Sequence, residues 1–161
     1  MTSDRVRGKW RPVVVHSVRT AVTAVASLLT ARLFRLPEAY WAAMTTLVIT
    51  QSSLGAALLV SWQRFFGTVL GVTVGAIAAH YFGASLLVFA AGVFVLGLLC
   101  FIAHADLTAY RFGGIALVIV LLIPRTGPGW KIAFHRFAEV SIGIGVALVL
   151  AMMWPEKEPM A

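Results

Sequence analysis

Hydrophobic residues fill six long stretches of the chain, which are separated by short junctions containing charged residues, Pro and Gly. The stretches show no strict two-residue alternation, so they do not predict the strands of a membrane barrel. Lipid offers no partner for backbone polar groups, and each stretch is therefore predicted to be a helix. The predicted helices span residues 13–34, 39–60, 64–82, 84–103, 108–123 and 131–154.

The aromatic residues support this division. All five Trp and all three Tyr lie at or just outside an end of a predicted helix, and both residue types favour the membrane–water interface. No charged residue occurs between Arg64 and Asp106, a run about twice as long as one span needs, and Gly83 is its natural break. The pattern predicts an all-α integral membrane protein with six transmembrane helices.

Composition argues against the soluble alternatives. Of the 161 residues, 60% are hydrophobic and 12% are charged, whereas a soluble domain has about 25% charged residues. Disordered chains are polar, and one soluble core of this size cannot hide so much apolar surface. Six spans of about 20 residues leave roughly 40 positions for ends and loops. A single transmembrane domain over residues 1–161 is therefore expected.

The net charge of +7 bears on topology rather than on nucleic acid. The basic residues are scattered one or two per helix end and form no continuous stripe, so no nucleic-acid partner is predicted. If the N-terminus is cytoplasmic, eight Lys and Arg residues lie on that side and five on the other. The positive-inside rule then favours cytoplasmic N- and C-termini.

The third and sixth predicted helices resemble each other. Arg64 and Phe65 correspond to Arg136 and Phe137 at an offset of 72 positions, and a glycine stands seven residues after each arginine. The second and fifth predicted helices match at an offset of 70. The alternative explanation is chance similarity between two apolar helices. The shared Arg-Phe pair favours an internal repeat over this alternative.

Two three-helix units, about 13–82 and 84–154, would then follow one another. Because three is odd, the second unit enters the membrane upside down. Such an inverted 3+3 repeat is typical of transporters, whose sites lie at the interface between the repeats.

Three arginines in or beside the predicted spans are the candidate anion-binding residues, because a charge in a bilayer is costly. Arg19 would bind an anion in a polar path or extend to the cytoplasmic interface. Arg64 and Arg136 begin the third and sixth predicted helices, where interfacial placement is again the structural alternative. Because the repeat places these two arginines at equivalent positions, it favours a functional role for them. Inversion of the second unit would place them toward opposite ends of one pathway. Guanidinium groups bind carboxylates in a two-pronged geometry.

Six further positions carry polar side chains or packing roles. Glu139 stands three residues after Arg136, on the same helix face. It forms either a structural salt bridge or a proton-coupling site, because a carboxyl removed from water is more easily protonated. Gln51 and Ser52 would line a path or bond to a neighbouring helix. A glycine at every fourth position permits close helix packing, within the chain or between subunits. These glycines are Gly67, Gly71 and Gly75.

No catalytic constellation occurs: the chain has no Ser-His-Asp arrangement, no zinc-protease motif and no phosphate-binding Gly loop. We therefore expect no enzymatic activity, no cofactor and no metal.

Three segments carry a family resemblance. They are Pro37-Glu38-Ala39-Tyr40-Trp41-Ala42, then Arg64-Phe65-Phe66-Gly67-Thr68 followed by Gly71 and Gly75, and Arg136-Phe137-Ala138-Glu139 followed by Ile142-Gly143. In these segments, and over residues 13–154 as a whole, the chain resembles the fusaric acid resistance family. This group includes the bacterial aromatic acid exporters, and the plant aluminium-activated malate transporters, which are anion channels, look like distant members.

The resemblance implies a six-helix block, organic-anion substrates and the assembly of two blocks. By similarity to the malate channels, the arginines that line the anion path fall on Arg64 and Arg136. Typical exporters carry two blocks and a large cytoplasmic region, whereas this chain ends seven residues after Trp154. A homodimer in the lipid bilayer of the bacterial inner membrane is therefore expected, and pairing with another subunit is the alternative.

Together these features predict an exporter of small organic anions, with aromatic carboxylates as substrates and proton coupling as its drive. A passive organic-anion channel is the alternative within transport. A membrane assembly subunit without transport activity is the alternative outside it.

Overall fold

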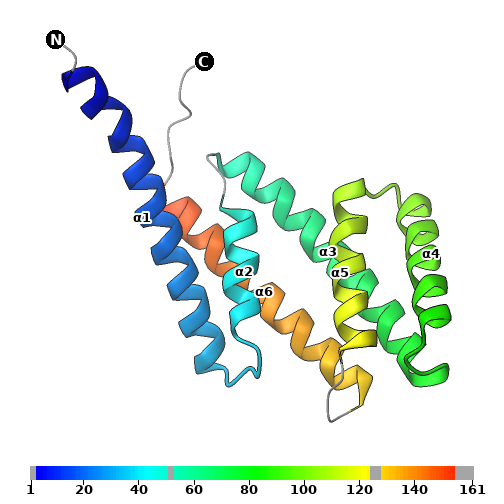
Figure 1. Ribbon diagram of the computed structural model, residues 1–161. Helices are drawn as coiled ribbons and strands as arrows, with labels where there is room; N and C mark the ends of the chain where they lie inside the picture. Colours follow the sequence, from blue (N-terminus) through cyan, green and yellow to red (C-terminus); the bar gives the residue numbers. More distant parts are fainter. Residues whose placement is uncertain (1–2, 51–52, 124–127, 155–161) are drawn as a thin grey trace.

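The computed structural model describes residues 3–50, 53–123 and 128–154, with the backbone alone for residues 3–9, 11 and 12. Within these residues the chain forms six helices that alternate in direction, so α1 begins and α6 ends toward the same end of the bundle (Figure 1). The all-α prediction is confirmed. The helices are α1 (Ser3–Leu33), α2 (Tyr40–Ile49), α3 (Leu54–Tyr81), α4 (Leu86–Ile102), α5 (Leu107–Leu122) and α6 (Gly129–Met153).

The prediction of one helix over residues 39–60 is wrong. α2 ends at Ile49, Thr50 has an extended backbone, and α3 begins at Leu54. The Ser53 side chain accepts a hydrogen bond from the Ala56 N–H, which satisfies one of the free donors at the start of α3. The sequence signal for this break is the run of four polar residues at 50–53, which ends in a serine suited to cap a helix. Trp62, predicted at a helix end, consequently lies within α3.

Length and apolar composition qualify three of the described helices as membrane spans, fewer than the six predicted. They are α1 over Val13–Leu33, α3 and α6. α4 and α5 have 17 and 16 residues, or about 25 Å each, and the 10 residues of α2 extend about 15 Å. The hydrocarbon core of a bilayer is about 30 Å thick. The exact number of spans therefore does not follow from helix length.

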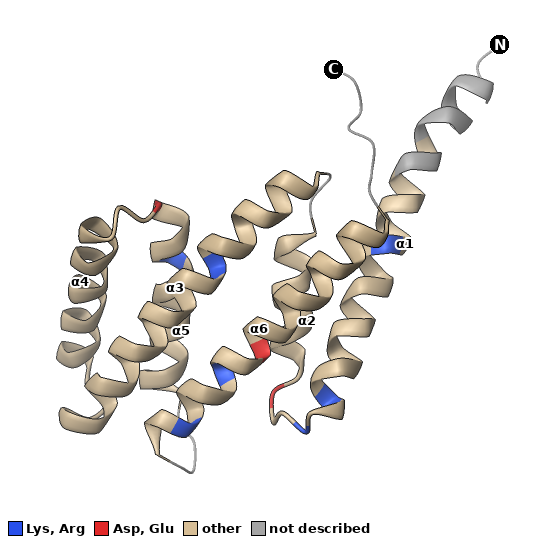
Figure 2. Ribbon diagram, turned by 180° about the vertical axis from the view of Figure 1, so that it is seen from behind, with Lys and Arg blue, Asp and Glu red and all other residues tan. Residues whose placement is uncertain are grey.

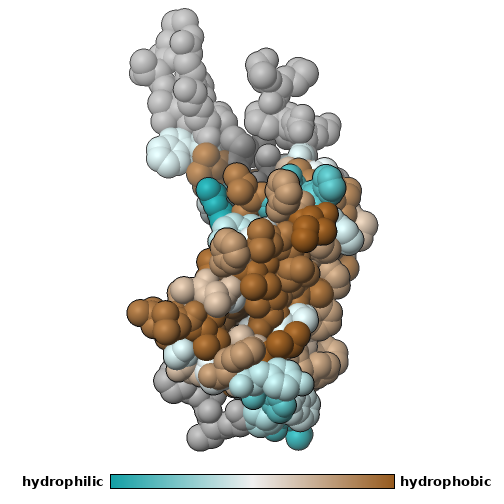
Figure 3. All heavy atoms as spheres, turned by 90° about the vertical axis from the view of Figure 1, so that its right-hand side faces the viewer, coloured by the Kyte–Doolittle hydropathy of each residue, from teal (hydrophilic) through white to brown (hydrophobic). Residues whose placement is uncertain are grey.

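The outer surface is apolar, as a bilayer environment requires. α4 carries no charged residue (Figure 2). The side of the molecule on which α4 lies shows a broad hydrophobic area (Figure 3), and on α4 the side chains of Leu87 and Phe101 are 83% and 81% exposed. Soluble monomers rarely expose contiguous apolar patches of large size.

α3 and α6 run antiparallel through the centre of the bundle. α3 packs against α5, and α6 packs against α2. α1 covers α2 and α6, whereas α4 covers α5 and α3. Leu96, Leu117 and Leu121 belong to the apolar cluster between α4, α5 and α3.

Glycines allow α3 to approach α5 at the level of their backbones. A Cβ added at Gly67 would overlap the carbonyl oxygen of Ala109, and one added at Gly71 would overlap that of Gly113. Gly75 instead faces the side chain of Val120. In this structure the glycine series therefore lies against α5 of the same chain.

We expect Gly71→Ala to lower the free energy of unfolding by about 1–3 kcal/mol, the usual cost of overpacking, because the added Cβ forces two backbones apart. Gly114→Ala on α5 is the matched control, since a Cβ there meets open space. It should be neutral or stabilising, because alanine favours the helix more than glycine does. Thermal unfolding of the detergent-solubilised protein measures both variants, and equal shifts in Tm would contradict the close approach.

Candidate anion-binding site

Two of the predicted arginines meet one face of α2. Arg64 on α3 donates from Nε to the Thr45 Oγ1 at 3.1 Å. The Arg136 Cζ, from α6, lies 3.6 Å from the centroid of the Trp41 ring. Trp41 and Thr45 are four residues apart and so share a face of α2. The two arginines therefore contact α2 at positions about one helical turn apart.

The prediction that these arginines begin their helices is wrong. α3 begins ten residues before Arg64, and α6 begins seven residues before Arg136. Their side chains are only 5% and 2% exposed. Interfacial placement keeps the charged head of an arginine in water, so this degree of burial argues against it.

Arg136 has an acidic neighbour on its own helix. Its Nη1 lies 3.7 Å from the Glu139 Oε2, and the Glu139 Oε1 accepts a hydrogen bond from the Glu38 N–H at 3.1 Å. The Glu38 Oε2 in turn accepts from the Trp41 Nε1 at 2.8 Å. These four side chains tie the turn between α1 and α2 to the middle of α6. The arrangement gives the Arg136 charge a carboxylate and an aromatic ring at once.

Arg64 differs from Arg136 in its charge balance. Gly67 stands three residues after Arg64, whereas Glu139 stands three residues after Arg136. Among the described residues, Arg64 forms no ion pair; besides the Thr45 hydroxyl it contacts the ring of Phe112 on α5, whose centroid is 4.7 Å from Cζ. A buried cation without a compensating charge is costly. We use the term arginine cluster for Arg64 and Arg136 with their contacts on α2. Within it, Arg64 is the buried charge that would be stabilised by a bound anion.

Buried polar side chains concentrate around the same helices. Within the described part of the chain, the ten buried polar or charged residues lie on α1, α2, α3 and α6, whereas α4 and α5 bury only apolar residues and glycine. Polar groups inside a membrane protein face the interior or a path rather than lipid. The ten are Arg19, Thr23, Ser27, Thr45, Thr46, Ser61, Arg64, Thr68, Arg136 and Glu139.

Arg19 lies apart from the other two arginines. It is buried between α1 and the end of α6, where it lines a small cavity with Thr23, Leu150 and Trp154. Leu150 follows Arg136 by 14 residues, or about 20 Å along α6. The remaining pathway candidates, Gln51 and Ser52, lie outside the described residues.

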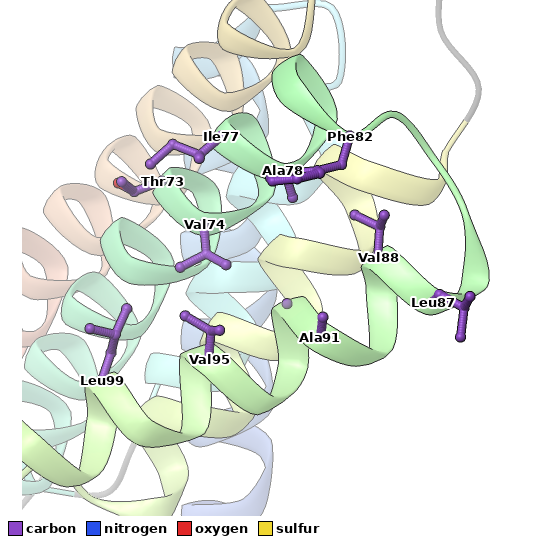
Figure 4. Close-up of a pocket in the computed structure, with 11 residues that line it drawn as sticks. Thr73, Val74, Ile77, Ala78, Phe82, Leu87, Val88, Ala91, Val95 and Leu99 are labelled. Carbon is purple, nitrogen blue, oxygen red and sulfur yellow. The ribbon is translucent and has the colours of Figure 1, made fainter.

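A cavity with an apolar lining between α3 and α4 does not suit a carboxylate. It has a volume of about 540 Å³ and lies between α3 and α4, with Val74, Ala78, Val88 and Val95 among its lining residues (Figure 4). Thr73 supplies the hydroxyl in this lining, and no lining residue is charged. The cavity is separate from the arginine cluster.

Sequence reasoning missed Thr45 and Phe112 as members of the site. Neither has a local signal, because each meets Arg64 from a different helix. Glu38 and Trp41 did stand out, but only as part of the motif that opens the second predicted helix.

Comparison with known proteins places these residues in a family. Residues 22–150 match the model of the family described as fusaric acid resistance protein-like. The chain belongs to this family. The resemblance drawn from the sequence motifs is thereby confirmed.

Relatives of this fusaric acid resistance-like chain occur in Escherichia coli (strain K12). Inner membrane protein YeeA is 31% identical over 152 residues, covering 89% of this chain and 42% of YeeA. Inner membrane protein YccS is 24% identical over 142 residues, covering 88% of this chain and 20% of YccS. Uncharacterized protein YhfK is 39% identical over 70 residues, covering 44% of this chain and 10% of YhfK. The chain thus spans less than half the length of these relatives, and no solved structure matches it.

Proposed function

We propose that this fusaric acid resistance-like chain moves organic carboxylate anions across the inner membrane. It acts as an exporter of aromatic carboxylates and works as a homodimer with cytoplasmic termini. The observation that carries the proposal is Arg64, a buried guanidinium near the middle of a long apolar helix without an ion pair among the described residues. A substrate carboxylate supplies the missing charge.

The distribution of polar groups supports a path beside Arg64. Among the described residues, the buried hydroxyl-bearing and charged side chains lie on α1, α2, α3 and α6, whereas α4 and α5 bury only apolar residues and glycine. An anion that leaves water needs such fixed partners to replace its hydration. Arg19, near the end of α6, adds positive charge further along this interior.

Helix pairing supports the proposed inverted 3+3 repeat, with halves at 13–82 and 84–154. α3 packs on α5 as α6 packs on α2, and α1 lies on α2 and α6 as α4 lies on α5 and α3. The ring centroids of Phe65 and Phe137, which correspond in the two halves, are 5.5 Å apart. Equivalent residues meet when two halves are related by a two-fold axis at that point. The arginine cluster then lies at the interface between the repeats, where transporters bind substrate.

Glu139 is the proposed proton-coupling group. While ionised it holds Arg136, and when protonated it leaves Arg136 to a second carboxylate. Among the groups that face it are the Arg136 guanidinium on its own helix and the Glu38 main-chain N–H from the turn between α1 and α2. Binding of a proton and release of Arg136 are thereby linked.

Flux from liposomes tests the function. Purified protein is reconstituted with trapped radiolabelled benzoate, and efflux is followed with and without a pH gradient across the membrane. An exporter should show saturable efflux that a proton gradient drives. Glu139→Gln, which cannot exchange a proton, should keep downhill efflux but lose its response to the gradient.

Two other results would contradict the exporter proposal and favour one of the alternatives. A current of benzoate that follows voltage alone and ignores the pH gradient identifies a passive channel. Absence of flux for every carboxylate tested, with folded protein in the liposomes, contradicts transport and favours an assembly subunit. Protein-free liposomes set the leak rate.

A further inference from the structure

The Arg64 guanidinium is held by two contacts from different helices. Thr45 on α2 accepts a hydrogen bond from Nε at 3.1 Å, and the Phe112 ring on α5 lies beside the group, 4.7 Å from Cζ to its centroid. The first contact fixes one nitrogen, and the second restricts the plane of the group. Among the described residues, the two terminal nitrogens of Arg64 have no hydrogen-bond partner.

The hydroxyl of Thr45 behaves differently from other hydroxyls in these helices. Six of them donate to the carbonyl oxygen four residues earlier in the same helix or at its end, which is the usual arrangement for a helical Ser or Thr. The Thr45 Oγ1 instead has Arg64 as its hydrogen-bond partner among the described residues, although Thr45 is fully buried. The six are Ser17, Thr23, Thr30, Thr46, Thr50 and Thr73.

A guanidinium presents two edges that bind a carboxylate through two parallel hydrogen bonds. One edge contains Nε, and Thr45 already uses that nitrogen. The edge formed by the two terminal nitrogens remains for a ligand. Holding Nε also prevents the long side chain from adopting other rotamers, so less entropy is lost when the carboxylate binds.

We propose that Thr45 is a positioning residue for the anion site: it holds Nε of Arg64 so that the terminal edge of the guanidinium receives the substrate carboxylate. Phe112 assists by restricting the plane of the group. This inference rests on the proposed function, because it assigns the orientation of the arginine that the transport proposal uses.

The test compares hydroxyl-free and hydroxyl-bearing variants in benzoate-loaded liposomes. Thr45→Val should raise the half-saturation concentration about fivefold, the loss expected for one net hydrogen bond, with little change in maximal rate. Thr45→Ser, which keeps the hydroxyl, should stay close to the wild type. Thr73→Val is the matched control on α3, because the Thr73 hydroxyl bonds to its own helix.

A second pair of variants keeps the test conclusive if Thr45→Val does not fold. Thr45→Ala and Thr45→Ser differ by a single oxygen atom, and the hydroxyl effect is measured between them if the valine variant is not recovered. Unchanged half-saturation without the hydroxyl overturns the positioning role, and so does a loss of fold in both hydroxyl-free variants. If the wild type itself shows no saturable benzoate efflux, the proposed function fails, so the two failures are distinguishable.

Discussion

Replacing Arg64 with Met should abolish saturable benzoate efflux while making the protein more stable. Charge-assisted hydrogen bonds contribute about 1.5–3 kcal/mol each, so losing the guanidinium should weaken carboxylate binding by at least tenfold. The same substitution removes a buried cation that has no ion pair among the described residues. A well-packed apolar replacement for buried charge is often neutral or stabilising by about 1–4 kcal/mol. A rise in Tm together with a loss of benzoate transport would indicate that Arg64 serves function at a cost in stability.

Arg64→Lys is the informative control for this variant. Lysine keeps the positive charge but lacks the planar fork that binds carboxylate through two hydrogen bonds. We expect partial efflux with a raised half-saturation concentration. Efflux at the wild-type level in Arg64→Met, measured in folded protein, would remove this arginine from the substrate path.

Arg136→Met should have the opposite effect on stability. It would leave the Glu139 carboxylate buried without the cation that lies 3.7 Å away. Breaking one side of a buried pair costs about 3–5 kcal/mol. It would also remove the contact between the guanidinium and the Trp41 ring, which joins α6 to α2. A large fall in Tm is therefore expected.

A double-mutant cycle separates these contributions. Arg136→Met combined with Glu139→Gln removes both charges, so it should recover much of the stability that the single substitution loses. Thermal unfolding in detergent measures all four proteins. Equal stability of Arg64→Met and Arg136→Met would contradict the difference in charge balance between the two arginines.

The two arginines differ in the residue that stands three positions later in the chain. One glycine and one glutamate occupy corresponding positions, Gly67 and Glu139, three residues after each arginine. The glycine lets α3 lie against the α5 backbone, and it leaves Arg64 without an acidic neighbour on its own turn. The glutamate compensates Arg136 and also bonds to the turn before α2.

Hydropathy along the chain was sufficient for the class of protein and for most of the helices. The predicted stretches at 84–103, 108–123 and 131–154 agree closely with α4, α5 and α6. The stretch at 39–60 failed because its mean composition hides a short polar run, where capping by Ser53 begins a new helix. That error also moved the apparent start of the following helix to Arg64.

The sequence by itself determined the membrane environment, the helical class, the family and the shared face of Arg136 and Glu139. These depend on composition and on neighbours within one helical turn, which are local properties. Only the tertiary structure decided that Arg64 is buried against Thr45, 19 positions earlier in the chain, and that Glu139 bonds to the backbone of Glu38, 101 positions away. Such contacts arise from the packing of α3 and α6 against α2 and its preceding turn. No periodicity within a single helix encodes them.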